Sequence, residues 1–275
     1  MQISDALEIA SLTDPGRLRK RNEDYVAERP ESGLVLLADG MGGYNAGDVA
    51  SGMATDLVAE GIAQEWHAAR LAKMDRLQAR ELAAGLIRQH VARANSAVHQ
   101  AAQHTPEYSG MGTTLVVGLF FDNLLTVGHV GDSRLYRLRG EALEQLTRDH
   151  SLLQEQIDQG VISKEEARRS HNKNLVTRAL GVDPAVETEV HTHAVAAGDV
   201  YLLCSDGLND MIDDEEIRLT LLTLKSNVQL AAQHLVQAAN DSGGRDNVSV
   251  VLIKVLNEFQ VTRSWLVKLK SWFKR

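Results

Sequence analysis

The chain has 275 residues, of which 44% are apolar, 24% charged and only 4% aromatic, and it carries a formal net charge of −8. These values are ordinary for a globular protein with an aliphatic core, and the negative charge argues against nucleic acid as the main partner. The single cysteine, Cys204, excludes an intrachain disulfide and favours a reducing compartment. We expect a cytoplasmic protein, because the N-terminus does not resemble a signal peptide and no stretch approaches the about 20 apolar residues of a membrane span.

The first half of the chain predicts two strands and two long helices. Residues 7–12 alternate apolar and polar side chains as a half-buried strand does, and a polar loop follows. Residues 33–39 are apolar almost throughout, which is typical of a strand covered on both faces. Apolar residues then recur at helical spacing over residues 47–66 and about 76–103, so both segments are predicted to be amphipathic helices.

The second half predicts mainly strands, closed by two helices and a last strand. Short turns separate strand signals at 113–121, 124–132 and 134–140, so we expect antiparallel hairpins. Residues 149–180 are mostly polar and only weakly helical, and we interpret them as an insertion with little core of its own. Further strands are predicted at 186–195, 199–206 and 247–255, and helices at about 214–223 and 226–240.

This order of elements favours an α+β fold with helices outside packed sheets. We predict one domain over residues 1–256 and a C-terminal tail over residues 257–275. Tryptophans and leucines of the tail fall at helical spacing among lysines and arginines, as in a basic amphipathic helix. Such a helix could fold back on the domain, lie on an anionic membrane surface or dock on a partner, and all three alternatives stay open.

Four aspartates stand beside strand signals in glycine-rich turns. They are Asp39 in "LLADG", Asp132 in "HVGDSR", Asp206 in "LLCSDG" and Asp246 in "GGRDNVSV". Glu23 and Asp24 in "RNEDY" add two more acids. If these segments converge, six carboxylates share one site, and divalent cations would remove their mutual repulsion. Oxygen ligands without paired histidines or cysteines favour Mg²⁺ or Mn²⁺ over Zn²⁺.

Each of these residues has an ordinary alternative. Aspartate and glycine often end strands because they are turn residues, so only the recurrence of the pattern indicates a site. Arg19 alone would belong to a solvated basic turn, since Arg17, Lys20 and Arg21 are its neighbours. Because an acidic "NED" follows it, we interpret Arg19 as a candidate to bind two phosphate oxygens with its guanidinium group.

The ordered motifs of the chain resemble those of a known family. The segments are "TDPGRLRKRNED", "ADGMGGYNAGDVAS", "GMGTTLVV", "HVGDSRLY", "LTRDHS", "LVTRALG", "SDGL" and "GGRDNVSVV". From about residue 10 to residue 255 they are similar, in order and spacing, to the bacterial metal-dependent Ser/Thr phosphatases of the protein phosphatase 2C family. The resemblance implies a four-layer α-β-β-α sandwich, in which helix pairs flank two antiparallel sheets and residues 149–180 form a flap beside the cleft.

The resemblance also implies a set of metal ligands. Two Mn²⁺ or Mg²⁺ ions are expected in a cleft at one end of the sandwich. By similarity, Asp39 bridges both ions and the Gly40 carbonyl binds one of them, while Asp206 and Asp246 complete the other. Asp132, together with Asp206, matches the position of a third, weaker ion.

The implied reaction is hydrolysis of phosphoserine or phosphothreonine by a water that bridges the cations, opposing a Ser/Thr kinase. Arg19 would bind the substrate phosphate, and Glu23 and Asp24 would hold metal-bound waters or orient the site. Met41 occupies a position where animal-type members carry histidine, and methionine cannot donate a proton. A metal-bound water or another side chain would have to donate it, and His150 and His171, near the flap, are the candidate side chains.

Two rival functions remain in view. A catalytically weak phosphoprotein-binding module on the same fold is disfavoured by the intact set of Asp39, Asp206 and Asp246. Another two-metal hydrolase, such as a nuclease, is disfavoured by the acidic net charge. Cys204 is interpreted as a structural strand residue, because a Cys-x5-Arg nucleophile loop would need arginine where Asp210 stands. We expect a monomer whose partners are phosphorylated proteins and a cognate Ser/Thr kinase.

Overall fold

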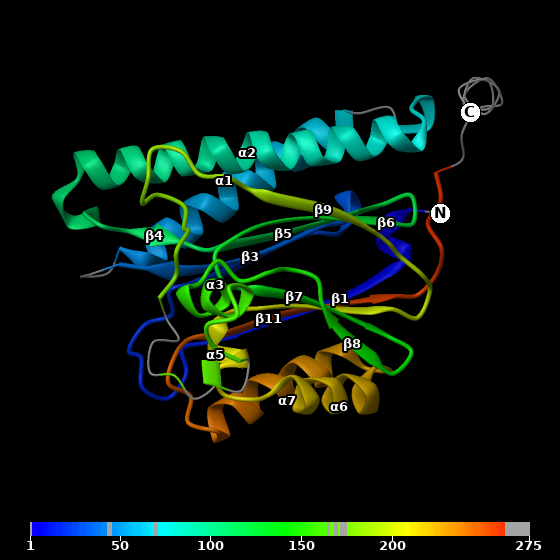
Figure 1. The fold of residues 1–275 in the computed structure, drawn as a ribbon. Coiled ribbons are helices and arrows are strands. Elements are labelled where there is room, and N and C mark those ends of the chain that lie inside the picture. Colours follow the sequence, from blue (N-terminus) through cyan, green and yellow to red (C-terminus); the bar gives the residue numbers. More distant parts are fainter. Residues whose placement is uncertain are drawn as a thin grey trace.

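Two antiparallel sheets pack face to face in the computed structural model, and a pair of helices covers the outer face of each (Figure 1). The structure describes residues 2–42, 46–68, 71–163, 166–167, 170 and 175–261. Every strand pair within these residues is antiparallel. The predicted four-layer α-β-β-α sandwich is confirmed.

The first sheet has the strand order β1, β11, β10, β7, β8. Its strands are β1 (Leu7–Asp14), β7 (Arg134–Arg139), β8 (Ala142–Gln145), β10 (Val200–Cys204) and β11 (Val248–Val255). Helices α6 (Asp214–Leu224) and α7 (Val228–Asp241) cover it, and their apolar sides bury Leu221 and Leu235 against Leu202 and Val250.

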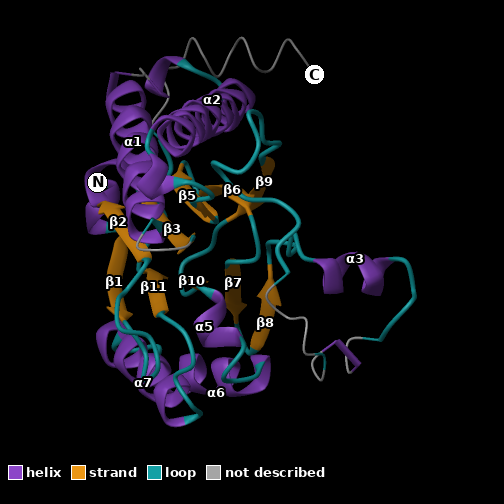
Figure 2. Ribbon diagram, turned by 90° about the vertical axis from the view of Figure 1, so that its left-hand side faces the viewer, coloured by secondary structure: helices purple, strands orange, loops and turns teal. Residues whose placement is uncertain are grey.

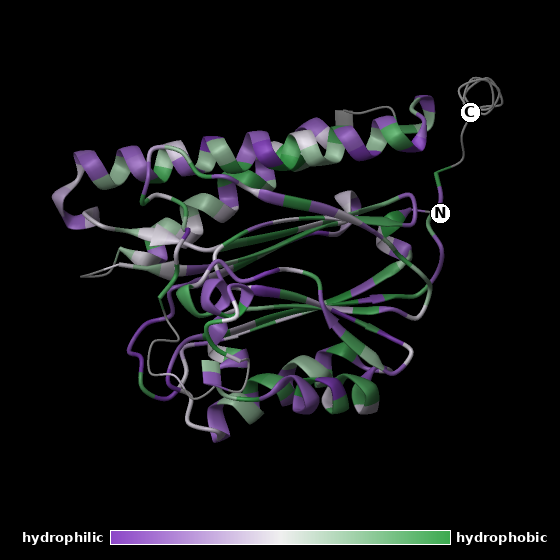
Figure 3. Ribbon diagram, in the orientation of Figure 1, coloured by the Kyte–Doolittle hydropathy of each residue, from purple (hydrophilic) through white to green (hydrophobic). Residues whose placement is uncertain are grey.

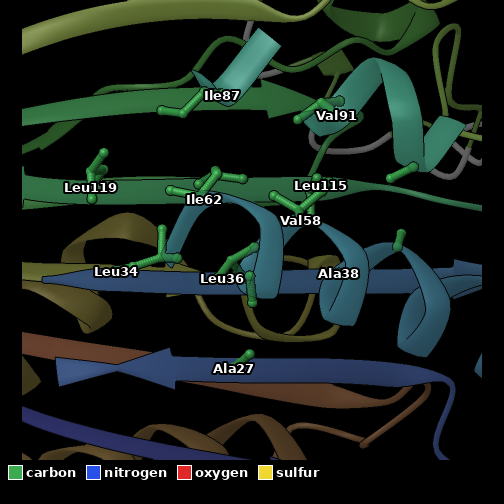
Figure 4. Packing of buried hydrophobic residues seen from close by; sticks show 14 of the residues in the cluster. Ala27, Leu34, Leu36, Ala38, Val58, Ile62, Ile87, Val91, Leu115 and Leu119 are labelled. Atoms are coloured by element: carbon green, nitrogen blue, oxygen red, sulfur yellow. The ribbon is translucent and has the colours of Figure 1, made fainter. Parts of the chain in front are cut away.

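The second sheet has the strand order β2, β3, β5, β6, β9, and β4 pairs with β3. Its strands are β2 (Asp24–Arg29), β3 (Leu34–Met41), β4 (Gly112–Thr113), β5 (Leu115–Phe121), β6 (Leu124–Val130) and β9 (Glu189–Ala194). Helices α1 (Gly47–Ala68) and α2 (Arg76–His104) cover this sheet. Figure 4 shows Val58 of α1 and Val91 of α2 packed over Leu36 and Leu115 of the sheet.

Strand β3 explains why residues 33–39 are apolar at almost every position. Leu34 and Leu36 pack toward the helices, whereas Val35 and Leu37 face the core between the two sheets. Both faces of β3 are therefore buried, as the sequence predicts. Apolar residues dominate the strands, while polar residues lie on the outer sides of the helices (Figure 3).

Several boundaries and short elements differ from the sequence predictions. The sequence did not predict β2, because the segment "DYVAER" holds three charged residues, nor β8 or the short helix α5 (Asp206–Asn209). The segment 113–121 is divided into β4 and β5, and β9 begins only at Glu189. Short 3₁₀ helices cover Ile3–Asp5, Pro30–Ser32, Leu71–Lys73 and Pro106–Tyr108.

The described residues of the insertion at 149–180 stand to one side of the sandwich (Figure 2). Its helix α3 (Leu152–Asp158) begins at Ser151, whose side chain accepts a hydrogen bond from the Gln154 amide. Ser151 also forms a β-bridge with Val176 that closes the base of the insertion. His171, a candidate for the general acid, lies outside the described residues.

The chain leaves the body of the fold beside the turn between β5 and β6. Asp122 and Asn123 form this turn with positive φ angles of 50° and 55°, as a tight two-residue hairpin requires. The Phe259 amide donates to the Asn123 side chain at 2.6 Å, and the Val261 amide donates to that of Asp122 at 2.9 Å. Residues 262–275 lie outside the described residues, so the proposed amphipathic helix stays a prediction. None of the helices in the described part of the chain is long and apolar enough to cross a bilayer.

Candidate active site

The aspartates that follow or precede strands meet at one end of the two sheets. Asp39 lies near the end of β3, Asp132 and Asp206 follow β6 and β10, and Asp246 precedes β11. A cavity of about 200 Å³ forms between them. It is lined by Arg19, Glu23, Asp39, Gly40, Met41, Gly42, Thr114, Asp132, Val176, Asp206 and Asp246. The convergence on which the sequence argument depends is therefore present.

Hydrogen bonds to neighbouring segments hold the backbone of Asp39 in place at the cavity. Its amide donates to the Thr114 hydroxyl at 3.0 Å, and its carbonyl accepts from the Thr114 amide at 2.9 Å. Gly40 donates to the Glu23 carbonyl at 3.1 Å. A Cβ at Gly40 would lie 2.1 Å from the Gly47 carbonyl oxygen, so only glycine lets the end of β3 approach the start of α1 this closely.

Asp24 faces Asp39 across the β2–β3 ladder, as the paired residues of the register. It is 6% exposed, and its Oδ2 accepts a hydrogen bond from the Ser205 hydroxyl at 2.8 Å. Its Oδ1 is buried and has no hydrogen-bond partner among the described residues. A buried carboxylate oxygen without a partner is costly unless a cation or an ordered water meets it.

Burial and crowding raise the pKa values of the central aspartates. Removal from solvent, followed by the charges of neighbouring carboxylates, raises the pKa of Asp39 and of Asp206 well above the usual range. Burial raises the pKa of Asp24 to about 6 and that of Asp132 to about 7. Divalent cations would neutralise this concentration of negative charge, and carboxylate and carbonyl oxygens are the ligands that Mg²⁺ and Mn²⁺ prefer. The residues present therefore fit such ions.

These shifts predict the pH dependence of the metal-free protein. An aspartate with a higher pKa in the folded than in the unfolded chain stabilises the fold while protonated, and this contribution is lost as pH rises through the folded-state pKa. For Asp24 and Asp132 the loss extends from the unfolded-state pKa, about 4, to the folded-state values of about 6 and about 7. In urea titrations of metal-stripped protein, the free energy of unfolding should therefore fall from about pH 4 to about pH 7 and then level off. A rise over this interval would contradict the shifts, and saturating Mn²⁺ should remove the fall.

Arg19 lies at the rim of the cavity, where its guanidinium donates to Asp246 at 2.7 Å. This hydrogen bond raises the pKa of the guanidinium further. The Arg19 side chain is 54% exposed, so an incoming anion can reach it from solvent. Glu23 lies beside it, and burial followed by the charge of Asp48 raises the Glu23 pKa.

The structure does not support His150 as the general acid. His150 is buried, and its Nδ1 accepts a hydrogen bond from the Gly131 amide at 3.1 Å. Its Nε2 faces Glu189 at 3.3 Å, and its ring stacks on His129. His150 thus stabilises the base of the flap through these contacts. It does not line the cavity, whereas Met41 is one of the lining residues.

Solvent exposure indicates the roles of the single cysteine and of two histidines. Cys204 is fully buried, and burial raises the pKa of its thiol to about 12, so it is a structural residue. On β9, His191 is exposed, whereas His193 is partly buried and its Nε2 has no hydrogen-bond partner in the described part of the chain.

A second cavity, of about 310 Å³, adjoins the first. Asp132 and Asp206 line both cavities. The second one lies between the flap helix α3 and the segment that joins α5 to α6, and the sequence did not predict it. Leu153, Ile157 and Met211 form part of its wall.

Comparisons with known proteins agree with this geometry. The family model described as Protein phosphatase 2C matches residues 18–246. The protein phosphatase PhpP of Streptococcus pneumoniae is 39% identical over 258 residues, which cover 92% of this chain and 99% of that protein. The chain belongs to the protein phosphatase 2C family. The family resemblance seen in the sequence is thereby confirmed, together with the expected enzyme class, a protein Ser/Thr phosphatase.

Two further comparisons concern PstP, a relative of this protein phosphatase 2C. The Ser/Thr protein phosphatase PstP of Mycobacterium tuberculosis is 38% identical over 256 residues, which cover 93% of this chain and 46% of that protein. A crystal structure of the PstP catalytic domain in complex with two manganese ions superposes with a TM-score of 0.79 at 37% identity. The superposition covers 92% of this chain and 99% of the PstP chain in that structure.

Proposed function

We propose that the chain hydrolyses phosphoserine and phosphothreonine esters of proteins and so opposes a Ser/Thr kinase. One observation carries the proposal: the strand-end aspartates and Arg19 share one cavity at the end of the sandwich. The structure of PstP with two manganese ions supports the presence of cations in such a cavity. The acidic lining alone would repel a phosphate, so the proposal requires positive charge beyond that of Arg19.

The residues that would hold the cations are those expected from the sequence. Asp39 and the Gly40 carbonyl would bind at the end of β3, and Asp206 and Asp246 would bind from the opposite sheet. Asp132 would hold a third, weaker ion together with Asp206. When bound, such ions supply a water that is acidic enough to ionise near neutral pH and charge that stabilises the phosphoryl group.

The residues of the chain itself would orient the substrate. Arg19 would place its guanidinium on two phosphate oxygens, which requires it to exchange part of its hydrogen bond with Asp246 for the substrate. Glu23 and Asp24 would accept hydrogen bonds from waters at the site. No covalent phosphoenzyme is needed, and the buried thiol of Cys204 could not form one. Met41 lines the cavity and has no proton to donate, so another group, such as a water at the site, would protonate the leaving oxygen.

A regulatory phosphoprotein-binding module on the same fold is the alternative. It would retain Arg19 and the acidic cavity and would bind a phosphopeptide without turnover. The two functions are separated by release of phosphate from a phosphothreonine peptide with Mn²⁺, before and after addition of a chelator. We expect multiple turnovers that stop with chelator and resume with excess Mn²⁺. Binding without release would favour the module, and release that persists in chelator would exclude the metal-dependent reaction.

A further inference from the structure

The loop that carries Arg19 and Glu23 into the cavity has no regular structure of its own. It joins β1 to β2 and covers residues 15–23. The amides of Arg17 and Leu18 donate to the Gly244 carbonyl at 2.7 and 3.2 Å. These bonds fix the start of the loop, but they do not determine where its far end, beside Glu23, meets the cavity.

One buried side chain joins both ends of this loop. Asn247 is 5% exposed, and its Nδ2 donates to the Pro15 carbonyl at 3.0 Å and to the Arg21 carbonyl at 2.8 Å. Its Oδ1 accepts a hydrogen bond from the Glu23 amide at 2.8 Å. Both donors and the acceptor of the Asn247 amide are therefore used on backbone groups of the loop.

The neighbouring residue, Asp246, is the residue with which Arg19 pairs. The Asn247 backbone amide donates to Asp246 Oδ1 at 2.9 Å, and Arg19 donates to Asp246 Oδ2 at 2.7 Å. A Cβ at Gly16, where φ is +79°, would lie 2.2 Å from the Asp246 carbonyl oxygen. The loop thus lies directly against residues 246 and 247, and β11, which begins at Val248, anchors them in the core.

We propose that Asn247 is a positioning residue that fixes Arg19 and Glu23 relative to Asp246 and thereby sets the affinity for the substrate phosphate. The kinetic part of this inference rests on the proposed phosphatase function. The side chain of Asn247 does not line the cavity, so it acts through the loop. Only an amide suits the position, because a carboxylate would face two carbonyl oxygens and an apolar side chain would leave three backbone groups without partners.

Hydrogen exchange tests the structural part of the proposal in metal-free protein, independently of activity. Asn247→Ala should speed exchange of the Arg17, Leu18 and Glu23 amides by about tenfold or more, because the loop then opens more readily. Asn227→Ala is a matched control. Asn227 caps the start of α7 by accepting a hydrogen bond from the Leu230 amide, and the 14 residues of this helix, about 20 Å, separate it from Asp241. Equal exchange of the loop amides in both variants would overturn the proposal.

Kinetics test whether the loop acts through Arg19. We expect Asn247→Ala to raise both the KM for a phosphothreonine peptide and the inhibition constant of inorganic phosphate by about tenfold, and Asn227→Ala to change neither. In an Arg19→Ala background, Asn247→Ala should change the inhibition constant of phosphate by less than about twofold. An equal effect in both backgrounds, or unchanged constants despite faster loop exchange, would show that Asn247 is only structural.

The role of Asn247 can still be tested if the alanine variant does not fold or if the wild-type protein is inactive. If Asn247→Ala does not fold, Asn247→Ser retains one hydroxyl, which cannot reach all three backbone partners, and it replaces the alanine variant in both experiments. If the wild-type protein releases no phosphate from phosphopeptides, the proposed function fails. The exchange experiment, together with calorimetric titration of inorganic phosphate in Mn²⁺, then still decides the role of Asn247.

Discussion

Asp39→Asn should lower kcat/KM for a phosphothreonine peptide by about a thousandfold or more, while making the metal-free protein more stable. Asp39 lies near the end of β3 among other carboxylates, and the loss of solvent, followed by their charges, raises its pKa well above normal. A neutral amide relieves this repulsion, but it is a poorer ligand for a cation. The same substitution therefore has opposite signs for activity and for metal-free stability. Thermal unfolding with and without Mn²⁺, together with steady-state kinetics, measures both.

Asp199→Asn is the matched control for this substitution. Asp199 is buried, and it receives two hydrogen bonds from Arg139 at 2.8 and 2.7 Å, which lower its pKa. Its neutralisation should lower stability and leave kcat/KM within about twofold. The assignment of Asp39 would be wrong if Asp39→Asn kept near-normal activity, or if Mn²⁺ raised the melting temperature of this variant as much as that of the wild type.

Arg19→Ala should lower kcat/KM by about a hundredfold, mainly through KM and with a matching loss of inhibition by inorganic phosphate. Among the described residues that line the cavity, Arg19 is the one with a positively charged side chain, and it lies at the exposed rim. Arg19→Lys should recover only part of the loss, because an ammonium group cannot bind two phosphate oxygens in the same plane.

Lys20→Ala separates this role from a general effect of positive charge. Lys20 is the exposed neighbour of Arg19 in the same loop. If Arg19 binds phosphate directly, Lys20→Ala should change kcat/KM by less than about threefold at physiological salt, where exposed charges are screened. Equal losses in the two variants would favour the alternative that this segment is only a solvated basic turn.

The fold was predictable where a segment has a strong period or a long apolar run. The period of α1 and α2 and the apolar run of β3 determine these elements locally, and the structure places them close to the expected limits. Strand β2 escaped prediction because its stability comes from pairing with β3 and not from its own composition. The ends of β9 likewise depend on its partner β6, which no local pattern specifies.

The candidate site was predictable as a set of residues but not as an arrangement. Recurring aspartates beside strands indicated which carboxylates would meet, and the cavity contains them. The sequence could not show that His150 turns away from the cavity, because its direction depends on bonds to Gly131 and Glu189 from distant segments. Asn247 was also missed, since an asparagine beside a ligand-like aspartate has no distinguishing pattern until its three partners are seen.

The anchoring of the C-terminal segment on Asp122 and Asn123 has a consequence for how the enzyme can be tethered. This turn ends β5, whose first residues lie beside the cavity, so a strand of seven residues, about 20 Å long, separates the two places. Whatever follows Val261 starts from the end of the sandwich that a substrate does not need to approach. A C-terminal attachment, natural or engineered, can thus restrain the enzyme at a surface while its cleft stays turned toward the surrounding solution.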